Sequence, residues 1–365
     1  MVSQQGQAVP EVKVGPRRLL MSGVRGQGEW GTGEPPPAHV WNPWTGRMWD
    51  TKHMLGYFGP QGTFTHQALL TLQIDEETQP YPSVGATLDA VREGKVRAGL
   101  VPLENSVEGG VSATIDNLAQ GEPLQIMAEV LLPVSFGLYV RPGTRIEDIR
   151  RIITHPHAAA QVRGWIAENL PEATMTEQGS TAAAAAEVSR EESIFDGAIC
   201  APVAGTLYGL AAVANEIGDN SDAVTRFILV SKPFSPDEPC GYDKTSVIVH
   251  LYSDHPGTLM ETLQQFALRG INLCRIESRP EKDKIGNYYF SIDAEGHIHE
   301  RRLQEALMSL HRTCREVTFL GSYPRADKVP QMVDKGMRDA DFTEADTWLA
   351  AITGQGVGDD EVGPY

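Results

Sequence analysis

The chain has 365 residues, and its 41% hydrophobic content is enough for two or three domains with well-packed cores. Its 31 basic and 48 acidic residues leave a formal net charge of −17, which argues against nonspecific binding to nucleic acid or to an anionic membrane. Four scattered cysteines without a CxxC spacing predict neither a zinc site nor a disulfide framework. With no run of 18 apolar residues and no signal-peptide pattern, we expect a cytoplasmic protein with reduced cysteines.

Residues 1–53 differ from the rest of the chain. They are rich in glycine and proline, and Trp41, Trp44 and Trp49 follow no helical or strand period. This composition predicts a flexible leader, and docking of the tryptophans on a partner surface remains the alternative.

From Met54 onward, short apolar strands alternate with helices, which is typical of an α/β domain with largely parallel pairing. Polar residues mark four strand-to-helix junctions, at 59–65, 104–112, 154–158 and 179–182. Each junction presents helix N-terminal amides, which favour negative charge. Since ligands of open α/β sheets bind beyond the carboxyl ends of the strands, the junctions together predict a cleft for a small anion.

A short buried strand at 197–202 precedes an alanine- and leucine-rich helix expected at 204–217. A polar turn then leads into the strand 224–231, which opens with Thr225-Arg226-Phe227. Arginine suits a carboxylate because its planar fork donates two parallel hydrogen bonds. The sequence has no GxGxxG with an acidic partner, GxxxxGK[ST], GxSxG or HExxH, so nucleotide-binding, serine-hydrolase and zinc-protease functions lack their motifs.

A proline-rich linker is expected at 236–244. Beyond it, 245–326 reads as strand, helix, two strands, helix and strand, the βαββαβ order of a ferredoxin-like module. The edges and open face of so small a sheet predict pairing with another copy. In the acidic tail, 327–365, a capping-box pattern at 343–346 predicts one amphipathic helix that docks on the body.

Seven segments in this order are typical of one family. They are GPQGTFT at 59–65, PLENSVEG at 102–109, THP at 154–156, STAA at 180–183, TRF at 225–227, PGTL at 256–259 and IESRP at 276–280. On these residues, about three quarters of the chain resembles the monofunctional bacterial prephenate dehydratases, in which a catalytic domain precedes a regulatory ACT domain.

The resemblance implies a catalytic domain at 54–235 whose two α/β lobes close like a type II periplasmic binding protein. An ACT domain of the ferredoxin-like βαββαβ type would follow at 245–326. The implied lyase reaction converts prephenate to phenylpyruvate with loss of water and CO₂ in phenylalanine biosynthesis. Because the ring of prephenate is one elimination away from aromaticity, neither a metal nor an organic cofactor is expected.

By the same resemblance, Thr225 is the catalytic residue, expected to orient the leaving hydroxyl through a hydrogen bond. Arg226 either holds a substrate carboxylate or turns away and braces the lobe, and both roles remain open. A structural role for Glu104 is at least as plausible as contact with a dianion. The residues implied in substrate binding are Arg226, Phe227, Thr63, Asn105, Ser106, Ser180 and Thr181.

In the ACT domain, the resemblance implies feedback by phenylalanine, bound between paired copies in a homodimer or homotetramer. The residues implied in effector binding are Gly257, Thr258, Leu259, Glu277, Ser278 and Arg279. The chain departs from the family pattern at His157, where many relatives carry glutamine. This histidine could titrate near neutrality, but a solvent-exposed histidine at a helix start is the interpretation that we favour.

Three other functions remain open on the sequence. The same elimination on the aminated substrate would make the protein an arogenate dehydratase. The two-lobed fold is also that of solute-binding proteins, although Thr225-Arg226 argues against transport. A non-catalytic amino-acid sensor built on the ACT domain would bind phenylalanine without forming a product.

Overall fold

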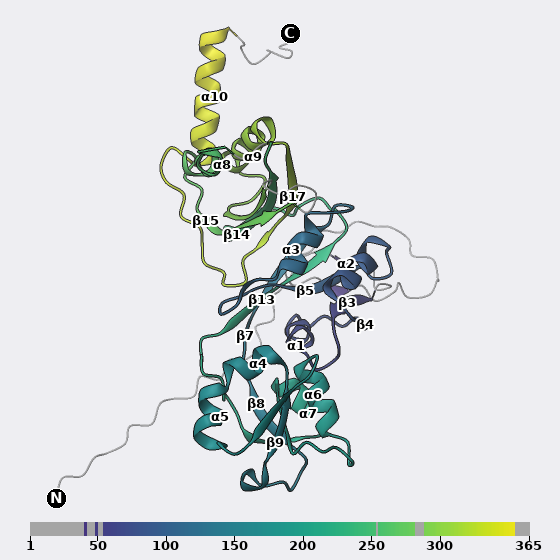
Figure 1. The fold of residues 1–365 in the computed structure, drawn as a ribbon. Helices are drawn as coiled ribbons and strands as arrows, with labels where there is room; N and C mark the ends of the chain where they lie inside the picture. The colour runs from purple at the N-terminus through teal and green to yellow at the C-terminus, as the bar shows by residue number, and fades with distance from the viewer. Residues whose placement is uncertain (1–39, 42–47, 50–53, 253–254, 282–287, 355–365) are drawn as a thin grey trace, which may run out of the picture. The chain divides into compact units, whose positions relative to one another are not determined.

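The computed structural model in Figure 1 describes residues 40–41, 48–49, 54–252, 255–281 and 288–354. Strands β1 (Val40–Trp41) and β2 (Met48–Trp49) form a small antiparallel pair. The remainder of the predicted leader lies outside the described residues. The body of the described chain holds three further sheets, two in the catalytic region and one in the C-terminal domain.

The first lobe is built on a six-stranded sheet in the order β4-β3-β5-β13-β7, with β6 paired to β5. Its strands are β3 (Leu55–Phe58), β4 (Thr78–Tyr81), β5 (Ala98–Asn105), β6 (Gly109–Gly110), β7 (Gln125–Pro133) and β13 (Val224–Ser231), and its helices are α1 (Phe64–Thr71), α2 (Val84–Arg92) and α3 (Ser112–Leu118). Strand β13 runs antiparallel to both β5 and β7. The sheet is therefore mixed, and the prediction of largely parallel pairing is wrong for this half of it.

The second lobe carries a five-stranded sheet in the order β10-β9-β11-β8-β12. Its strands are β8 (Gly137–Val140), β9 (Arg151–Thr154), β10 (Thr174–Glu177), β11 (Gly197–Cys200) and β12 (Ala211–Ala214), and its helices are α4 (Pro156–Gln161), α5 (Arg163–Asn169), α6 (Thr181–Val188), α7 (Pro202–Leu207) and the 3₁₀ helix η1 (Ile146–Asp148). The chain enters this lobe after β7 and returns at β13, so two connections join the lobes.

The helix predicted at 204–217 is wrong beyond residue 207. Helix α7 ends at Leu207, and Gly209 adopts φ +66°, a left-handed conformation that ends the helix. The small residues of β12 then pair antiparallel with β8. An alanine-rich run fits both a helix and a strand, and here pairing at a free sheet edge decides the outcome.

The C-terminal domain, residues 243–324, confirms the predicted βαββαβ order. Its elements are β14 (Asp243–His250), α8 (Thr258–Ala267), β15 (Leu273–Pro280), β16 (Tyr288–Glu295), α9 (Arg301–Thr313) and β17 (Glu316–Pro324). The antiparallel sheet has the order β15-β16-β14-β17. Both helices lie on one face of this sheet, and Figure 1 shows them together on that side.

The other face of this sheet packs on the first lobe, so this face is not open as the sequence predicted, and pairing of copies through the sheet edges stays a prediction. Ile126 and Ile228 of the first lobe share one buried apolar cluster with Ile248 and Leu320 of the C-terminal domain. At Gly321, φ is +123° and an added Cβ would lie 2.5 Å from the Ile126 carbonyl oxygen. Only glycine allows the two backbones to approach this closely.

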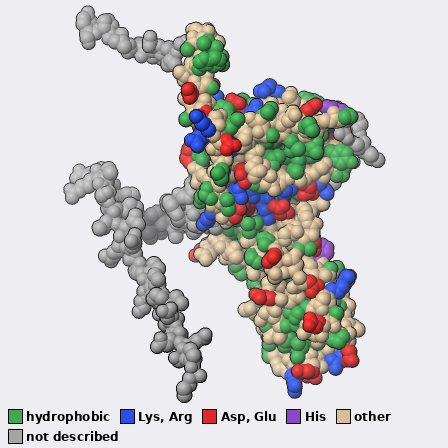
Figure 2. All heavy atoms as spheres, turned by 90° about the vertical axis from the view of Figure 1, so that its left-hand side faces the viewer, with side chains coloured by type: hydrophobic (Ala, Val, Ile, Leu, Met, Phe, Trp, Pro, Cys, Tyr) green, Lys and Arg blue, Asp and Glu red, His purple; other side chains and the backbone are tan. Residues whose placement is uncertain are grey.

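Helix α10 (Asp339–Thr353) confirms the helix predicted in the tail, but it starts earlier than the predicted capping box and contains no buried residue. Its beginning is tied to the C-terminal domain, where the Arg301 amide donates to Asp339 and the Arg301 guanidinium pairs with Asp346. Figure 2 shows apolar side chains gathered at its far end, where Trp348 and Ile352 are exposed. Docking of the whole helix on the body is therefore wrong.

Among the described residues, no helix has both the length and the apolar character to cross a bilayer. The same part of the chain brings together no group of three or more histidine, cysteine or acidic side chains that could hold a metal ion.

Candidate active site

A cavity of about 810 Å³ is lined by residues of both lobes. Much of its wall is aromatic. The aromatic side chains that line it are Phe58, Phe64, Tyr81, Phe136 and Phe227. Phe64 and Phe136 come from different lobes, and their rings meet edge to face with centroids 5.3 Å apart. Such a wall suits a flat apolar ring. The polar groups of the lining would fix the orientation of that ring in the cavity.

The hydroxyl of Thr225 lies at the start of β13, directly opposite Asn105 of β5. Asn105 Nδ2 donates to Thr225 Oγ1 at 2.8 Å, while Asn105 Oδ1 accepts from the amides of Val107 and Glu108. Because the loop amides hold the carboxamide in this orientation, the Thr225 oxygen already accepts one hydrogen bond. Its own proton is then available to donate into the cavity.

Two hydroxyls of the lining cap helices that begin at the cavity. Thr63 caps α1 by accepting from the His66 amide, and Ser180 caps α6 by accepting from the Ala183 amide. Both helices therefore direct the positive end of their dipoles toward the cavity. Thr181, next to the second cap, also lines the cavity.

Ser106 is not part of the lining. Its hydroxyl accepts from the Val224 amide at 2.9 Å, and its own amide donates to the Val224 carbonyl oxygen. It thus extends the pairing between β5 and β13 and holds Asn105 beside Thr225. The sequence predicted Ser106 as a substrate contact, whereas its geometry fits a role in positioning.

The described lining contains no lysine or arginine, and its charged or titratable groups are Tyr81, Glu108, His155 and His157. Burial lowers the pKa of His155, and the neighbouring His157 lowers it further, against the opposing effect of Glu108 and Glu177. His155 Nδ1 accepts from the His157 amide. An anion in this cavity would depend on helix-end amides and hydroxyls more than on fixed cations.

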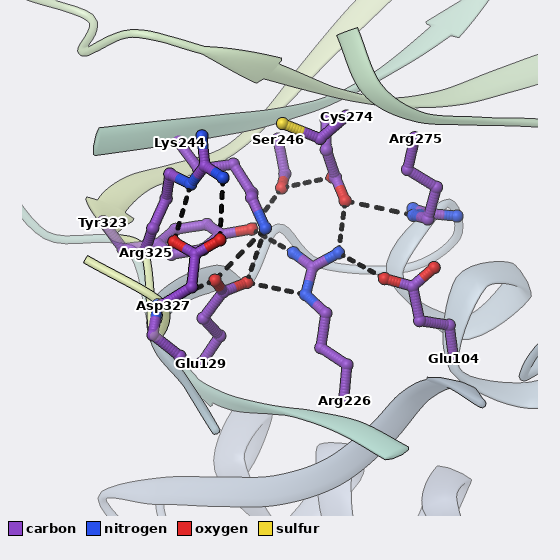
Figure 3. Close-up of polar contacts among 12 residues, drawn as sticks. Glu104, Glu129, Arg226, Lys244, Ser246, Cys274, Arg275, Tyr323, Arg325 and Asp327 are labelled. Carbon is purple, nitrogen blue, oxygen red and sulfur yellow. Dashed lines mark hydrogen bonds and ion pairs between the residues drawn. The ribbon is translucent and has the colours of Figure 1, made fainter. Parts of the chain in front are cut away.

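Arg226 lies on the other side of β13, buried against the C-terminal domain (Figure 3). Its Nε lies 2.6 Å from Glu129, and its Nη1 lies 2.8 Å from Glu104 and 2.6 Å from Asp293. Its Nη2 donates to the Tyr323 hydroxyl at 2.8 Å. Of the two roles predicted from the sequence, this geometry fits the bracing role, and the guanidinium does not line the cavity.

Arg226 and Asp293 favour the ionised form of each other. Burial by itself would lower the pKa of Arg226, but Asp293 and the other acidic neighbours outweigh it and raise that pKa above its ordinary value. Burial would likewise raise the pKa of Asp293, but Arg226 and Arg275 hold it well below its usual range. Lys244 completes the cluster with a 2.9 Å contact to Glu129. Glu104, ambiguous in the sequence, is a structural partner here.

Two of the predicted effector residues face the first lobe. Arg279 makes two hydrogen bonds to Asp116 of α3, at 3.1 and 3.2 Å, and Glu277 packs against Gly110. Gly257 precedes α8 with φ +102°, and the Thr258 hydroxyl is bonded to His255. In the other predicted members of this set, Leu259 and Ser278, the side chains are exposed.

The structure thus brings Thr225, Asn105, Thr63, Ser180, Thr181 and Phe227 together around one cavity. Sequence reasoning gave no site role to Phe64, Phe136, Glu108 or Gln161, which also line it. Phe64 and Glu108 stand inside segments that carried the resemblance, so their place in those motifs was an available signal. Phe136 and Gln161 had no such signal, because their place depends on how the lobes face each other.

Fold and site together define a two-lobed α/β enzyme with an interlobe cavity and an appended βαββαβ domain. The family model for prephenate dehydratase matches residues 55–235. The prephenate dehydratase of Amycolatopsis methanolica is 47% identical over 300 residues, covering 82% of this chain and 97% of that relative. The chain therefore belongs to the prephenate dehydratase family.

Solved structures show the same fold. A prephenate dehydratase from Arthrobacter aurescens in complex with L-Phe has a TM-score of 0.79 and 48% identity, covering 82% of this chain and 99% of that one. A chain described as GqqA, a novel type of quorum quenching acylase, has a TM-score of 0.68 and 29% identity, covering 74% of this chain and 97% of that one. The predicted fold class is confirmed.

Proposed function

We propose that the protein converts prephenate to phenylpyruvate, with release of CO₂ and water. The carbon–carbon bond to the ring carboxylate breaks, and its electron pair enters the ring. The ring hydroxyl departs and takes up a proton to leave as water. Aromatisation supplies the driving force, so the enzyme has to position the dianion and stabilise the departing oxygen.

The observation that carries this proposal is the Asn105–Thr225 hydrogen bond. Because Asn105 donates to Thr225 Oγ1, the Thr225 hydroxyl can in turn donate a hydrogen bond to the leaving hydroxyl. The Thr225 hydroxyl is too weak an acid to be a free proton donor near neutral pH, so its role is to orient and stabilise the leaving group. Thr225 is therefore the catalytic residue of the proposal.

The rest of the cavity fits the two ends of the substrate. The aromatic wall accommodates the ring, and the amides at the starts of α1 and α6, with the Ser180 hydroxyl, suit the carboxylates. The Thr63 hydroxyl donates to the Pro60 carbonyl oxygen at 2.9 Å, so Thr63 contributes by capping α1 at the cavity. Thr181 and Phe227 complete the wall on the α6 and β13 sides. No metal ion or organic cofactor enters this reaction scheme.

We further propose that phenylalanine inhibits the enzyme through the C-terminal domain, acting as an ACT domain. The Arthrobacter relative was crystallised with L-Phe, which supports an amino-acid effector here. Within the described residues, strand β15 is an edge of its sheet and pairs only with β16, so a second copy could pair there and complete the effector site. Light scattering with and without phenylalanine would test the expected dimer or tetramer.

The decisive experiment measures phenylpyruvate formed from prephenate by the purified chain in EDTA, with and without phenylalanine, and repeats the assay with arogenate. We expect turnover of prephenate that EDTA leaves unchanged and phenylalanine suppresses. Preference for arogenate would replace the proposed substrate with its aminated form. Tight phenylalanine binding without turnover of either compound would instead support an amino-acid sensor.

A further inference from the structure

A contact between a glutamate and a histidine joins the two lobes across the cavity. Glu108 lies between β5 and β6 of the first lobe, and His157 lies in the first turn of α4 in the second lobe. His157 Nδ1 is 2.7 Å from Glu108 Oε2, and Gln161 Nε2 donates to Glu108 Oε1 at 3.2 Å. All three residues line the cavity. The second lobe therefore holds both oxygens of this carboxylate.

Glu108 is the one carboxylate in the described lining of the cavity. A dianionic substrate must come close to it, and two like charges a few ångströms apart repel each other in a partly solvated site. The described lining offers no lysine or arginine to offset this charge. Only a histidine in its charged form can neutralise Glu108 from within the lining.

His157 is placed to do this. Besides Glu108, the titratable group against it is His155, whose ring centroid lies 4.9 Å away, and Glu177 of β10 acts on His155 from the other side. The side chains of His157 and Glu108 are 66% and 37% exposed, so the pair contributes little to folding stability. Its main effect is instead on the electrostatic potential that an anion meets when it enters the cavity.

We propose that His157 and Glu108 form a charge-compensated clasp that draws the lobes together and admits a dianionic substrate. His157 acts as a positioning residue that neutralises Glu108 and holds it toward the second lobe. With His157 neutral, Glu108 keeps its negative charge beside the substrate. The proposal rests on the proposed function in one respect, since it takes prephenate as the dianion.

The test measures kcat and KM for prephenate from pH 6 to pH 8.5, with the uncatalysed reaction subtracted. Histidine side chains change charge between about pH 5 and about pH 8, whereas carboxylates like those of the substrate stay ionised across the measured interval. In the parent protein we expect KM to rise on the order of threefold to tenfold with pH, and kcat to change less.

Three variants separate charge from shape. In H157Q, KM should be high and nearly independent of pH, because glutamine keeps a donor but never carries a charge. In H157K, KM should stay low up to pH 8.5, because lysine keeps its charge throughout. In E108Q, the repulsion is gone, so KM at pH 8.5 should fall to or below the parent value at pH 6.

The C-terminal domain offers a matched control. His297 and His299 repeat the same His-x-His geometry, with ring centroids 4.8 Å apart and the same backbone bond to Nδ1, away from the cavity. The H299Q variant should keep the parent KM profile. If H157Q and the parent share one KM profile, the clasp proposal is overturned, whereas absence of prephenate turnover in the parent would overturn the proposed function instead.

Discussion

The two faces of strand β13 bury different kinds of groups. Toward the cavity it presents Thr225 and Phe227, in a lining of aromatic rings, hydroxyls and helix ends. Toward the C-terminal domain it presents Arg226, in a cluster of full charges. That cluster consists of the cations Arg226, Lys244 and Arg275 and the anions Glu104, Glu129 and Asp293.

The difference teaches how one strand can serve chemistry and architecture at once. On the cavity side, the proton of the Thr225 hydroxyl remains available for a hydrogen bond to the substrate. On the other side every buried charge is in an ion pair, so removing one charge would leave its partner unpaired. Substitutions at neighbouring residues of this strand should therefore have different effects, on turnover at Thr225 and on stability at Arg226.

The largest expected effect is on stability, in R226M. Removing the guanidinium leaves Glu104, Glu129 and Asp293 facing one another without their shared cation, which should cost about 3–5 kcal/mol in the free energy of unfolding. Urea denaturation measures this loss. Kinetics below the unfolding transition should show a nearly unchanged KM, and a large rise in KM would restore Arg226 as a substrate ligand.

The R145M variant provides the comparison for this loss. Arg145 pairs with Glu147 at 3.2 Å, but both side chains are largely exposed. An exposed ion pair contributes about 0–1 kcal/mol, so this variant should unfold close to the parent midpoint.

The next effect is on turnover, in T225A. Loss of a hydrogen-bond donor to a developing oxyanion typically lowers kcat by about 10²–10³-fold. Thr225 lies at the strand end, half-buried, so the unfolding midpoint should change little. The T225S variant, which keeps the hydroxyl, should recover part of the activity. Near-normal turnover in T225A would contradict the catalytic role.

Much of this arrangement could be predicted from the sequence. Strand β13 has the predicted bounds, and Thr225, Asn105 and Ser180 meet at one cavity as the ordered motifs implied. The direction of the Arg226 side chain could also have been predicted, because successive side chains of a strand point to opposite faces. With Thr225 in the cavity, its neighbour must face away.

What could not be predicted depends on contacts between distant segments. Nothing in the run around Asp293 indicates that this buried aspartate meets Arg226, 67 positions away. The pairing of Glu108 with His157 likewise requires knowledge of how the two lobes face each other. The first lobe packs on the helix-free face of the C-terminal sheet, and this packing depends on Gly321. The sequence does not show this role, because it follows only from the close approach of the Ile126 backbone.

A smaller effect concerns stability in acid. Because the pKa of Asp293 is lowered on folding, its contribution is fully present above the pKa of an unfolded aspartate, about 4, and is lost as pH falls below it. The parent should therefore lose about 1 kcal/mol more than D293N between pH 5 and pH 3. Urea denaturation at both pH values measures the difference, and equal losses in the two proteins would contradict it.

The smallest expected effect is on regulation, and it links the two faces. The segment 105–116 holds Asn105 at the cavity and carries Asp116, which accepts hydrogen bonds from Arg279 and from the Tyr289 hydroxyl at 2.6 Å. If phenylalanine acts through the C-terminal domain, D116N should raise its half-inhibitory concentration by about threefold to tenfold, since single contacts change coupling by about 0.5–2 kcal/mol.

Turnover without phenylalanine should stay within about twofold of the parent in D116N, because Asp116 does not line the cavity. The control is D346N, which removes an exposed ion pair with Arg301 on the same domain and should leave inhibition unchanged.

Point variants are preferable to deletion of the domain, which would expose the buried Arg226 cluster and the apolar residues packed beside it. Equal inhibition of D116N and the parent would mean that the effector signal reaches Thr225 by another route, of which the Arg226–Asp293 contact is the nearest.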